Sequence, residues 1–230
     1  MAIESAQRRQ IPVRGIFYML ATAIVVFPLL NASVKYLAAD YSLVQIIWVR
    51  SIVHFVWMVA LFMPGLGWQL FATRRLGLQL TRSALQLVAL IAFVIGLIHI
   101  PMTTVTSIYF TSPLIVVVLA VFLLGERVGI RRWVAVLFGF LGALVIIRPG
   151  FEGMHWAALS ILASAVFYAL YQILTRRAAD HDDFRVSAVY TIVIALVVSS
   201  AAVPFYWETP IGWLDWLVFL LAIFPNWKLV

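Results

Sequence analysis

The chain has 230 residues, of which 65% are hydrophobic and only 11% are charged, with a net charge of +7. About a quarter of the residues in a soluble domain are charged, so the composition excludes an ordinary soluble protein. The basic residues form small clusters between apolar runs rather than one basic face, which argues against nucleic acid as a partner. The sequence has no cysteine, which excludes disulfides and thiolate chemistry.

Apolar runs, uncharged except for Arg50, predict membrane-spanning helices, because a hydrocarbon core about 30 Å thick requires about 20 mostly apolar residues per helix. The runs cover residues 15–34, 43–64, 83–100, 102–124, 133–147, 156–175, 186–207 and a last stretch that begins near residue 214. Irregular backbone cannot satisfy its polar groups in lipid, and the runs lack the alternation of a membrane β-barrel. We therefore expect an all-α polytopic membrane protein with about seven to eight transmembrane helices.

The positions of the basic residues predict the orientation of the chain. With the amino terminus in the cytoplasm, all lysines and arginines except Lys35, Arg50 and Arg148 fall on the cytoplasmic side. This is the positive-inside bias. We expect Arg82 to lie in one of the cytoplasmic loops. We expect residues 1–14 to form a cytoplasmic amino terminus in an inner or plasma membrane. A cleaved signal peptide in the first run is the alternative.

A weak internal similarity links the first and sixth runs. Residues 20–23 read Leu-Ala-Thr-Ala and residues 162–165 read Leu-Ala-Ser-Ala, while Ala-Ala-Asp occurs at 38–40 and again at 178–180. Five predicted helices precede the second copy, so the two copies enter the membrane from opposite faces, as in transporters with inverted repeats. This similarity favours a first run that is retained.

The repeat predicts two unequal parts. We expect a first five-helix repeat over residues 15–148 and a partial second repeat over residues 149–230, because the second part holds only about two and a half of the runs. We expect the chain to be a truncated product of a longer, ten-helix protein.

The fourth and fifth runs carry a specific pattern. Residues 107–114 read Ser-Ile-Tyr-Phe-Thr-Ser-Pro-Leu, residues 124–128 read Leu-Gly-Glu-Arg-Val, and the stretch 133–150 is rich in small and aliphatic residues and closes with Arg-Pro-Gly. Together they resemble the signature of EamA-type members of the drug/metabolite transporter superfamily. The resemblance implies two inverted five-helix repeats, alternating access and a central cavity for a small organic metabolite.

The function expected from this resemblance is secondary transport or export of a small molecule such as an amino acid, an amine or a nucleoside. The expected partners are that substrate, the lipid bilayer and, as a further candidate, a second copy of the chain; no cofactor is expected. An inactive remnant, or a half-module that needs a partner chain, is the alternative. An intramembrane enzyme is disfavoured, because the sequence has no paired aspartates in its apolar runs and no His-Glu-x-x-His motif, and the absence of a phosphate-binding loop argues against ATP-driven transport.

Arg50 is the most unusual residue of the apolar runs, because a charge at the centre of a membrane helix costs about 2.5–3.5 kcal/mol on insertion scales. His54 follows one turn later on the same face, and Asp40 precedes the helix. We expect a polar stripe that faces a cavity. The alternative is that Arg50 extends toward the membrane surface.

Two prolines predict breaks in helices. Pro28 removes a backbone donor one turn before Asn31, and Pro113 does the same in the fourth run, near Tyr109 and Ser112. Broken helices are typical of transporter binding sites, so we expect Asn31, Tyr109 and Ser112 to contact substrate. The alternative is that these polar groups only join helices to one another.

Further candidates lie in the sixth run and around the fifth. Tyr168 and Gln172 are four residues apart on one helix face, and we expect both to line the cavity. Glu126 follows the fourth run among arginines and is expected to hold a loop through weak ion pairs. Gly139 recurs with alanines at four-residue spacing, which indicates a close-packed helix surface rather than a binding site.

Overall fold

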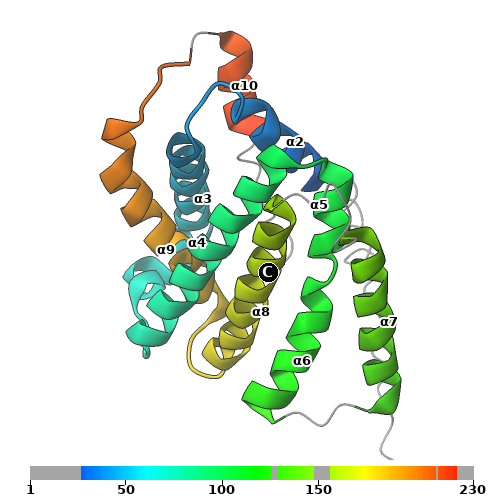
Figure 1. Ribbon diagram of the computed structural model, residues 1–230. Coiled ribbons are helices and arrows are strands. Elements are labelled where there is room, and N and C mark those ends of the chain that lie inside the picture. The colour runs from blue at the N-terminus through cyan, green and yellow to red at the C-terminus, as the bar shows by residue number, and fades with distance from the viewer. Residues whose placement is uncertain (1–26, 126–128, 148–155, 211, 222–230) are drawn as a thin grey trace, which may run out of the picture.

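The computed structural model describes residues 27–125, 129–147, 156–210 and 212–221, and within them every regular element is a helix (Figure 1). In chain order these are α2 (Phe27–Leu37), α3 (Leu43–Leu66), the short 3-10 helix η2 (Gly67–Phe71), α4 (Leu76–His99), α5 (Met102–Tyr109), α6 (Ser112–Leu124), α7 (Ile130–Ile147), α8 (Ala157–Ala179), α9 (Phe184–Ala202), η3 (Val203–Phe205) and α10 (Trp213–Leu221). The all-α expectation is therefore confirmed for the described residues.

Several helices of the described part have the length and composition of membrane spans. Five qualify, and they are Leu43–Phe71, Leu76–His99, Met102–Leu124, Ala157–Ala179 and Phe184–Phe205. An apolar helix of this length crosses a hydrocarbon core about 30 Å thick. The chain is a multi-pass membrane protein, whereas the inverted repeat and the total of seven to eight spans remain predictions.

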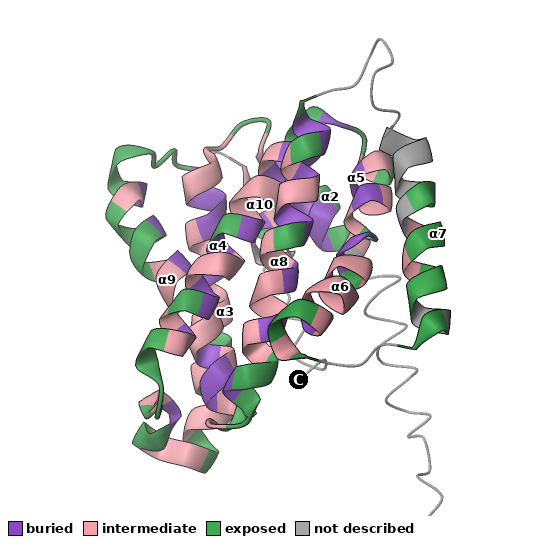
Figure 2. Ribbon diagram, turned by 60° about the horizontal axis from the view of Figure 1, so that its bottom comes forward, coloured by how far each residue is buried: buried purple, intermediate pink, exposed green. Residues whose placement is uncertain are grey.

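Helices α4 and α8 form the centre of the bundle (Figure 1). Helices α3 and α9 pack on one side of this pair, while α5, α6 and α7 lie on the other, with α10 against α2 near one end. Buried residues concentrate on the helices of the centre, and the outer faces are exposed (Figure 2). The space beside α8 is thus bordered by helices from both sides of the bundle.

The helix boundaries follow the predicted runs closely except at α4. Helix α3 begins at Leu43 as predicted, where the Ser42 hydroxyl accepts a hydrogen bond from the backbone N–H of Gln45 (3.3 Å). Helix α4 begins at Leu76, two turns before the predicted start at residue 83. Arg82 therefore lies inside a helix and is buried, which corrects its assignment to a cytoplasmic loop. The charge does not end the helix, because the neighbouring helices α8 and α9 supply acceptors for its hydrogen bonds.

The fourth predicted run is broken into two helices. Helix α5 ends at Tyr109 and α6 begins at Ser112, immediately before Pro113. The turn is held by Thr111, whose backbone N–H and hydroxyl both donate to the carbonyl of Ile108 (3.0 and 2.7 Å). Pro113 fits the first turn of α6, where no backbone donor is required. The break that we expected at Pro28 involves residues outside the described part of the chain.

Close contact between α4 and α8 depends on small side chains. Ser164 of α8 donates a hydrogen bond to the carbonyl of Ala89 in α4 (2.7 Å), and Gly96 faces Ile161. Small residues let membrane helices approach closely, so that packing and interhelical hydrogen bonds replace the weak hydrophobic driving force in lipid. This contact fixes the position of α8, which carries much of the candidate site.

Replacing Gly96 by alanine should destabilise this helix pair. A Cβ atom at position 96 would overlap the Ile161 side chain and lie 3.0 Å from the Ser160 hydroxyl. Overpacking of this kind costs about 1–3 kcal/mol. The measurement is the melting temperature of the detergent-purified protein, followed by tryptophan fluorescence. Gly77→Ala in the first turn of the same helix is the control, because its Cβ would meet nothing within 4 Å; equal melting temperatures for the two variants would contradict the prediction.

Candidate substrate site

Two cavities adjoin at helix α8. The first has a volume of about 370 Å³ and lies among α3, α4, α8 and α9, and the second, of about 530 Å³, lies among α5, α6 and α8. Tyr168 and Gln172 line both cavities. Two predicted site residues therefore form the boundary between the two spaces.

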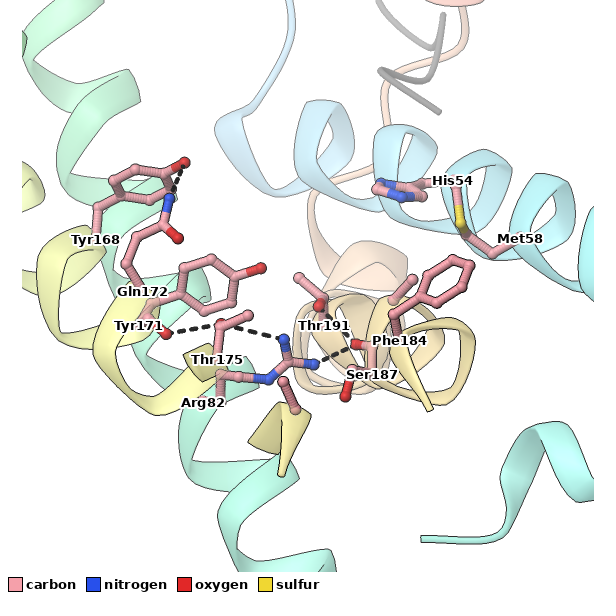
Figure 3. Close-up of a pocket in the computed structure, with 12 residues that line it drawn as sticks. His54, Met58, Arg82, Tyr168, Tyr171, Gln172, Thr175, Phe184, Ser187 and Thr191 are labelled. Atoms are coloured by element: carbon pink, nitrogen blue, oxygen red, sulfur yellow. Dashed lines mark hydrogen bonds between the residues drawn. The ribbon is translucent and has the colours of Figure 1, made fainter. Parts of the chain in front are cut away.

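A row of three tyrosines runs along this boundary. The ring of Tyr109, at the end of α5, lies 5.7 Å from that of Tyr168, which in turn lies 5.7 Å from the ring of Tyr171. Tyr168 and Tyr171 share a face of α8 because they are three residues apart. Gln172 donates a hydrogen bond to the Tyr168 hydroxyl (2.8 Å), which fixes the middle ring (Figure 3). This aromatic row, Tyr109, Tyr168 and Tyr171, offers a surface on which a flat ring can stack.

The break between α5 and α6 shapes the second cavity. Tyr109, Ser112 and Pro113 all line it. The Ser112 side chain is buried, and its hydroxyl has no hydrogen-bond partner within the described residues. An unsatisfied buried polar group costs about 1–3 kcal/mol, so a ligand that bonds to this hydroxyl gains that energy.

The other predicted site residues are placed differently. Arg50 is half-buried in α3 and interacts electrostatically with Tyr109 and His54, and His54 lines the first cavity. Asn31 is buried in α2 and does not belong to the lining of either cavity. The structure thus brings Tyr109, Ser112, Tyr168 and Gln172 together, places Arg50 near them and leaves Asn31 apart. Their contacts with substrate remain predictions.

Gly139, for which we expected a structural role, lies in α7 at the edge of the bundle. A Cβ atom on Gly139 of α7 would overlap the side chain of Leu114 in α6, so these helices approach closely there. Leu114 also lines an apolar cavity of about 380 Å³ between α6 and α7. Glu126 lies outside the described residues, and the roles expected for it, for Pro28 and for Gly139 remain predictions.

A buried polar cluster that we did not predict from the sequence lies at one end of the first cavity. Arg82 is 1% exposed and lines this cavity. Its Nη1 donates to the Thr175 hydroxyl (3.2 Å), its Nη2 donates to the Gln79 side-chain oxygen (2.9 Å), and Nη2 also donates to the carbonyl of Ser187. Figure 3 shows the guanidinium between Thr175 of α8 and Ser187 of α9. Arg82 therefore connects three helices.

Gln79 extends this cluster to the loop before α9. Its Nε2 donates to the Asp182 carboxylate and to the Ser187 hydroxyl, both at 2.9 Å. Burial alone would raise the pKa of Asp182, but hydrogen bonds from the Arg74 backbone, the Thr73 hydroxyl and Gln79 hold that pKa below its usual value. The carboxylate is thus charged and well bonded at neutral pH.

One sequence signal could have revealed this cluster. Polar residues occur at positions 79, 82, 83 and 86, which is the spacing of one face of a helix. The charge of Arg82 interrupts this pattern if charges mark the ends of membrane helices. The hydrogen-bond partners come from α8 and α9 and could not be assigned from α4 alone.

Comparison with known proteins is consistent with this architecture. The EamA-like transporter family model matches residues 13–148, more than half of the chain. A riboflavin transporter from Vibrio cholerae is 26% identical over 216 residues, which is 92% of this chain and 72% of that protein. An S-adenosylmethionine uptake transporter from Rickettsia felis is 29% identical over 150 residues, 65% of this chain and 51% of that protein. A pseudopaline exporter from Pseudomonas aeruginosa is 27% identical over 184 residues, 79% and 63% respectively. The chain belongs to the EamA-like transporter family.

Proposed function

We propose that the protein is a secondary transporter of the inner or plasma membrane that binds a small organic metabolite with a flat ring in the two adjoining cavities. The observation that carries this proposal is the aromatic row at the boundary of the cavities, fixed by the bond between Gln172 and Tyr168. Stacking on an aromatic side chain is worth about 1–3 kcal/mol per ring in nucleic-acid complexes. The relatives named for riboflavin and S-adenosylmethionine support this substrate class, because both compounds contain a flat heteroaromatic ring.

Movement of the substrate by alternating access fits the arrangement of the cavities. The first cavity extends along α8 as far as Ala179 and reaches Phe184 at the start of α9, whereas the second follows the break between α5 and α6. Discontinuous helices let one part of a transporter bundle rock against another. We propose that α5 and α6 change their angle at residues 110–111 and so open the site to either side of the membrane.

The proposed orientation, with a cytoplasmic amino terminus, is supported by the position of basic residues in the bundle. The backbone of Arg74 bonds to Asp182, and Arg177 donates to the carbonyl of Leu123 at the end of α6 (2.5 Å). The segments that carry these arginines therefore gather at one end of the bundle. That clustering is what the positive-inside bias expects of the cytoplasmic face.

Uptake into proteoliposomes tests the proposal. The full chain is reconstituted, and accumulation of labelled riboflavin and labelled S-adenosylmethionine is compared with that in protein-free vesicles. Saturable uptake of either compound, inhibited by the unlabelled compound, is the expected result. The proposal fails if neither compound enters the vesicles and neither raises the melting temperature of the purified protein.

A half-module that works with another copy is the second candidate. Large apolar side chains on α6 and α7 are exposed in the single chain, among them Phe122, Leu137 and Phe138. Lipid or a second copy can cover them. The molar mass of the detergent-solubilised protein, corrected for bound detergent, distinguishes one chain from two and shows which form carries uptake.

A further inference from the structure

We propose that Arg82 binds an oxyanion of the substrate, either a carboxylate or a phosphate, at one end of the first cavity. This proposal rests on the proposed transport function and specifies its substrate class as a flat ring with an anionic group. Arg82 lies within the span Leu76–His99, where a charged side chain is costly to insert and calls for a partner or a function.

The charge of Arg82 is solvated by neutral groups. The guanidinium bonds to a hydroxyl, an amide oxygen and a backbone carbonyl, and the ring of Tyr171 lies 5.4 Å from its central carbon. No carboxylate of the described residues lies within ion-pair distance of it. The protein therefore keeps a buried positive charge whose direct contacts are dipoles and a ring face, with the Asp182 carboxylate acting on it only from beyond Gln79.

The guanidinium also retains unused hydrogen-bonding capacity. An arginine has five N–H donors, and only Nη1 and Nη2 of Arg82 have partners in the described part of the chain. Its Nε is buried and has none. Charge-assisted hydrogen bonds to a carboxylate or phosphate are the strongest bonds a guanidinium forms. An oxyanion in the cavity would compensate the charge and can accept from Nη1, which has two N–H donors and bonds only to Thr175.

Asp182 is the carboxylate that could make Arg82 purely structural, but Gln79 separates the two. The Gln79 oxygen accepts from Arg82 while its nitrogen donates to Asp182, which also takes bonds from Thr73 and Arg74. Asp182 is thus occupied by its own donors. If Arg82 only joined helices, its charge would not affect the affinity for any ligand.

The aromatic row places a ring-binding surface next to this charge. Tyr171 lies 5.7 Å from the ring of Tyr168 and 5.4 Å from the central carbon of Arg82, so a ligand of mononucleotide size reaches both. Tyr168 and Arg82 line the same cavity. A ring stacked on the row and an oxyanion at Arg82 can therefore belong to one molecule.

Matched pairs of neutral and anionic ring compounds test this proposal. Binding of riboflavin and flavin mononucleotide, and of nicotinamide and nicotinate, is measured by titration calorimetry on the purified full chain. We expect the anionic member of at least one pair to bind about tenfold more tightly. Arg82→Gln should abolish this preference, so that both members of a pair bind equally. Arg82→Lys keeps the charge and should retain part of the preference.

Arg75→Gln is the control, because this exposed arginine lies two turns before Arg82 at the start of the same helix. Equal binding of both members by the unaltered protein, or a preference that survives Arg82→Gln, overturns the anion subsite. If Arg82→Gln does not fold, Arg82→Lys and competition by inorganic phosphate take its place. The anion subsite is overturned if Arg82→Lys keeps the full preference and phosphate does not reduce the preference of the unaltered protein. Binding of the neutral rings without anion preference leaves the transport function standing; no binding by any of the four compounds removes both proposals.

Discussion

Gln79→Leu should lower the free energy of unfolding by about 1–3 kcal/mol, the loss typical of buried polar groups that lose a hydrogen-bond partner. Gln79 is fully buried, and its amide bonds at once to Arg82, Asp182 and Ser187. Leucine fills a similar volume but offers no hydrogen bond. Arg82 would lose an acceptor, and the loop before α9 would lose its connection to α4.

The measurement is unfolding of the detergent-solubilised protein by a graded addition of denaturant. Gln69→Leu is the matched control, because Gln69 lies exposed in η2 near the same end of the bundle. Gln79→Glu adds a second test: it keeps an acceptor for Arg82 but places a carboxylate beside Asp182, so it should fall between the two. A Gln79→Leu protein as stable as Gln69→Leu would show that the cluster contributes little to stability.

The helices could be predicted from the sequence because the bilayer imposes a simple rule. In lipid the backbone N–H and C=O groups must form hydrogen bonds within the protein itself. Apolar runs of sufficient length therefore correspond to helices. The starts of α3 and α5 agree with the runs that begin at residues 43 and 102. The rule does not hold at α4, which begins at Leu76 and continues through the charged Arg82. Arg82 is tolerated inside the helix because acceptors on α8 and on α9 reach it.

Parts of the candidate site could be predicted where the relation between residues is local. Tyr168 and Gln172 share a helix face by spacing alone, and Pro113 indicates a break next to Tyr109. The pairing of α5 with α8 that brings Tyr109 to Tyr168 depends on how helices pack, which spacing does not encode. The same limit explains why Asn31, which we expected to contact substrate, lines neither cavity. Its helix could be predicted, but its position follows from the packing of α2 against α4 and α10.

Tyr168→Ala should weaken binding of a flat-ring substrate about tenfold to a hundredfold, with riboflavin as the probe. The ring of Tyr168 is the middle member of the aromatic row and borders both cavities. Stacking energies of about 1–3 kcal/mol correspond to this range of affinity, since each 1.4 kcal/mol is a factor of ten. The dissociation constant is measured by quenching of riboflavin fluorescence, and uptake into proteoliposomes is measured in parallel.

Tyr168→Phe separates stacking from hydrogen bonding at this position. The phenylalanine keeps the ring but cannot accept the bond from Gln172, so affinity should fall by a smaller factor than in Tyr168→Ala. Tyr206→Ala is the control, because that tyrosine is 55% exposed and follows η3 far from the row in sequence. If alanine at 168 binds riboflavin as tightly as alanine at 206, the aromatic row does not hold the ring. The polar groups of Ser112 and Arg82, which line the second and the first cavity, would then have to position the substrate without stacking on Tyr168.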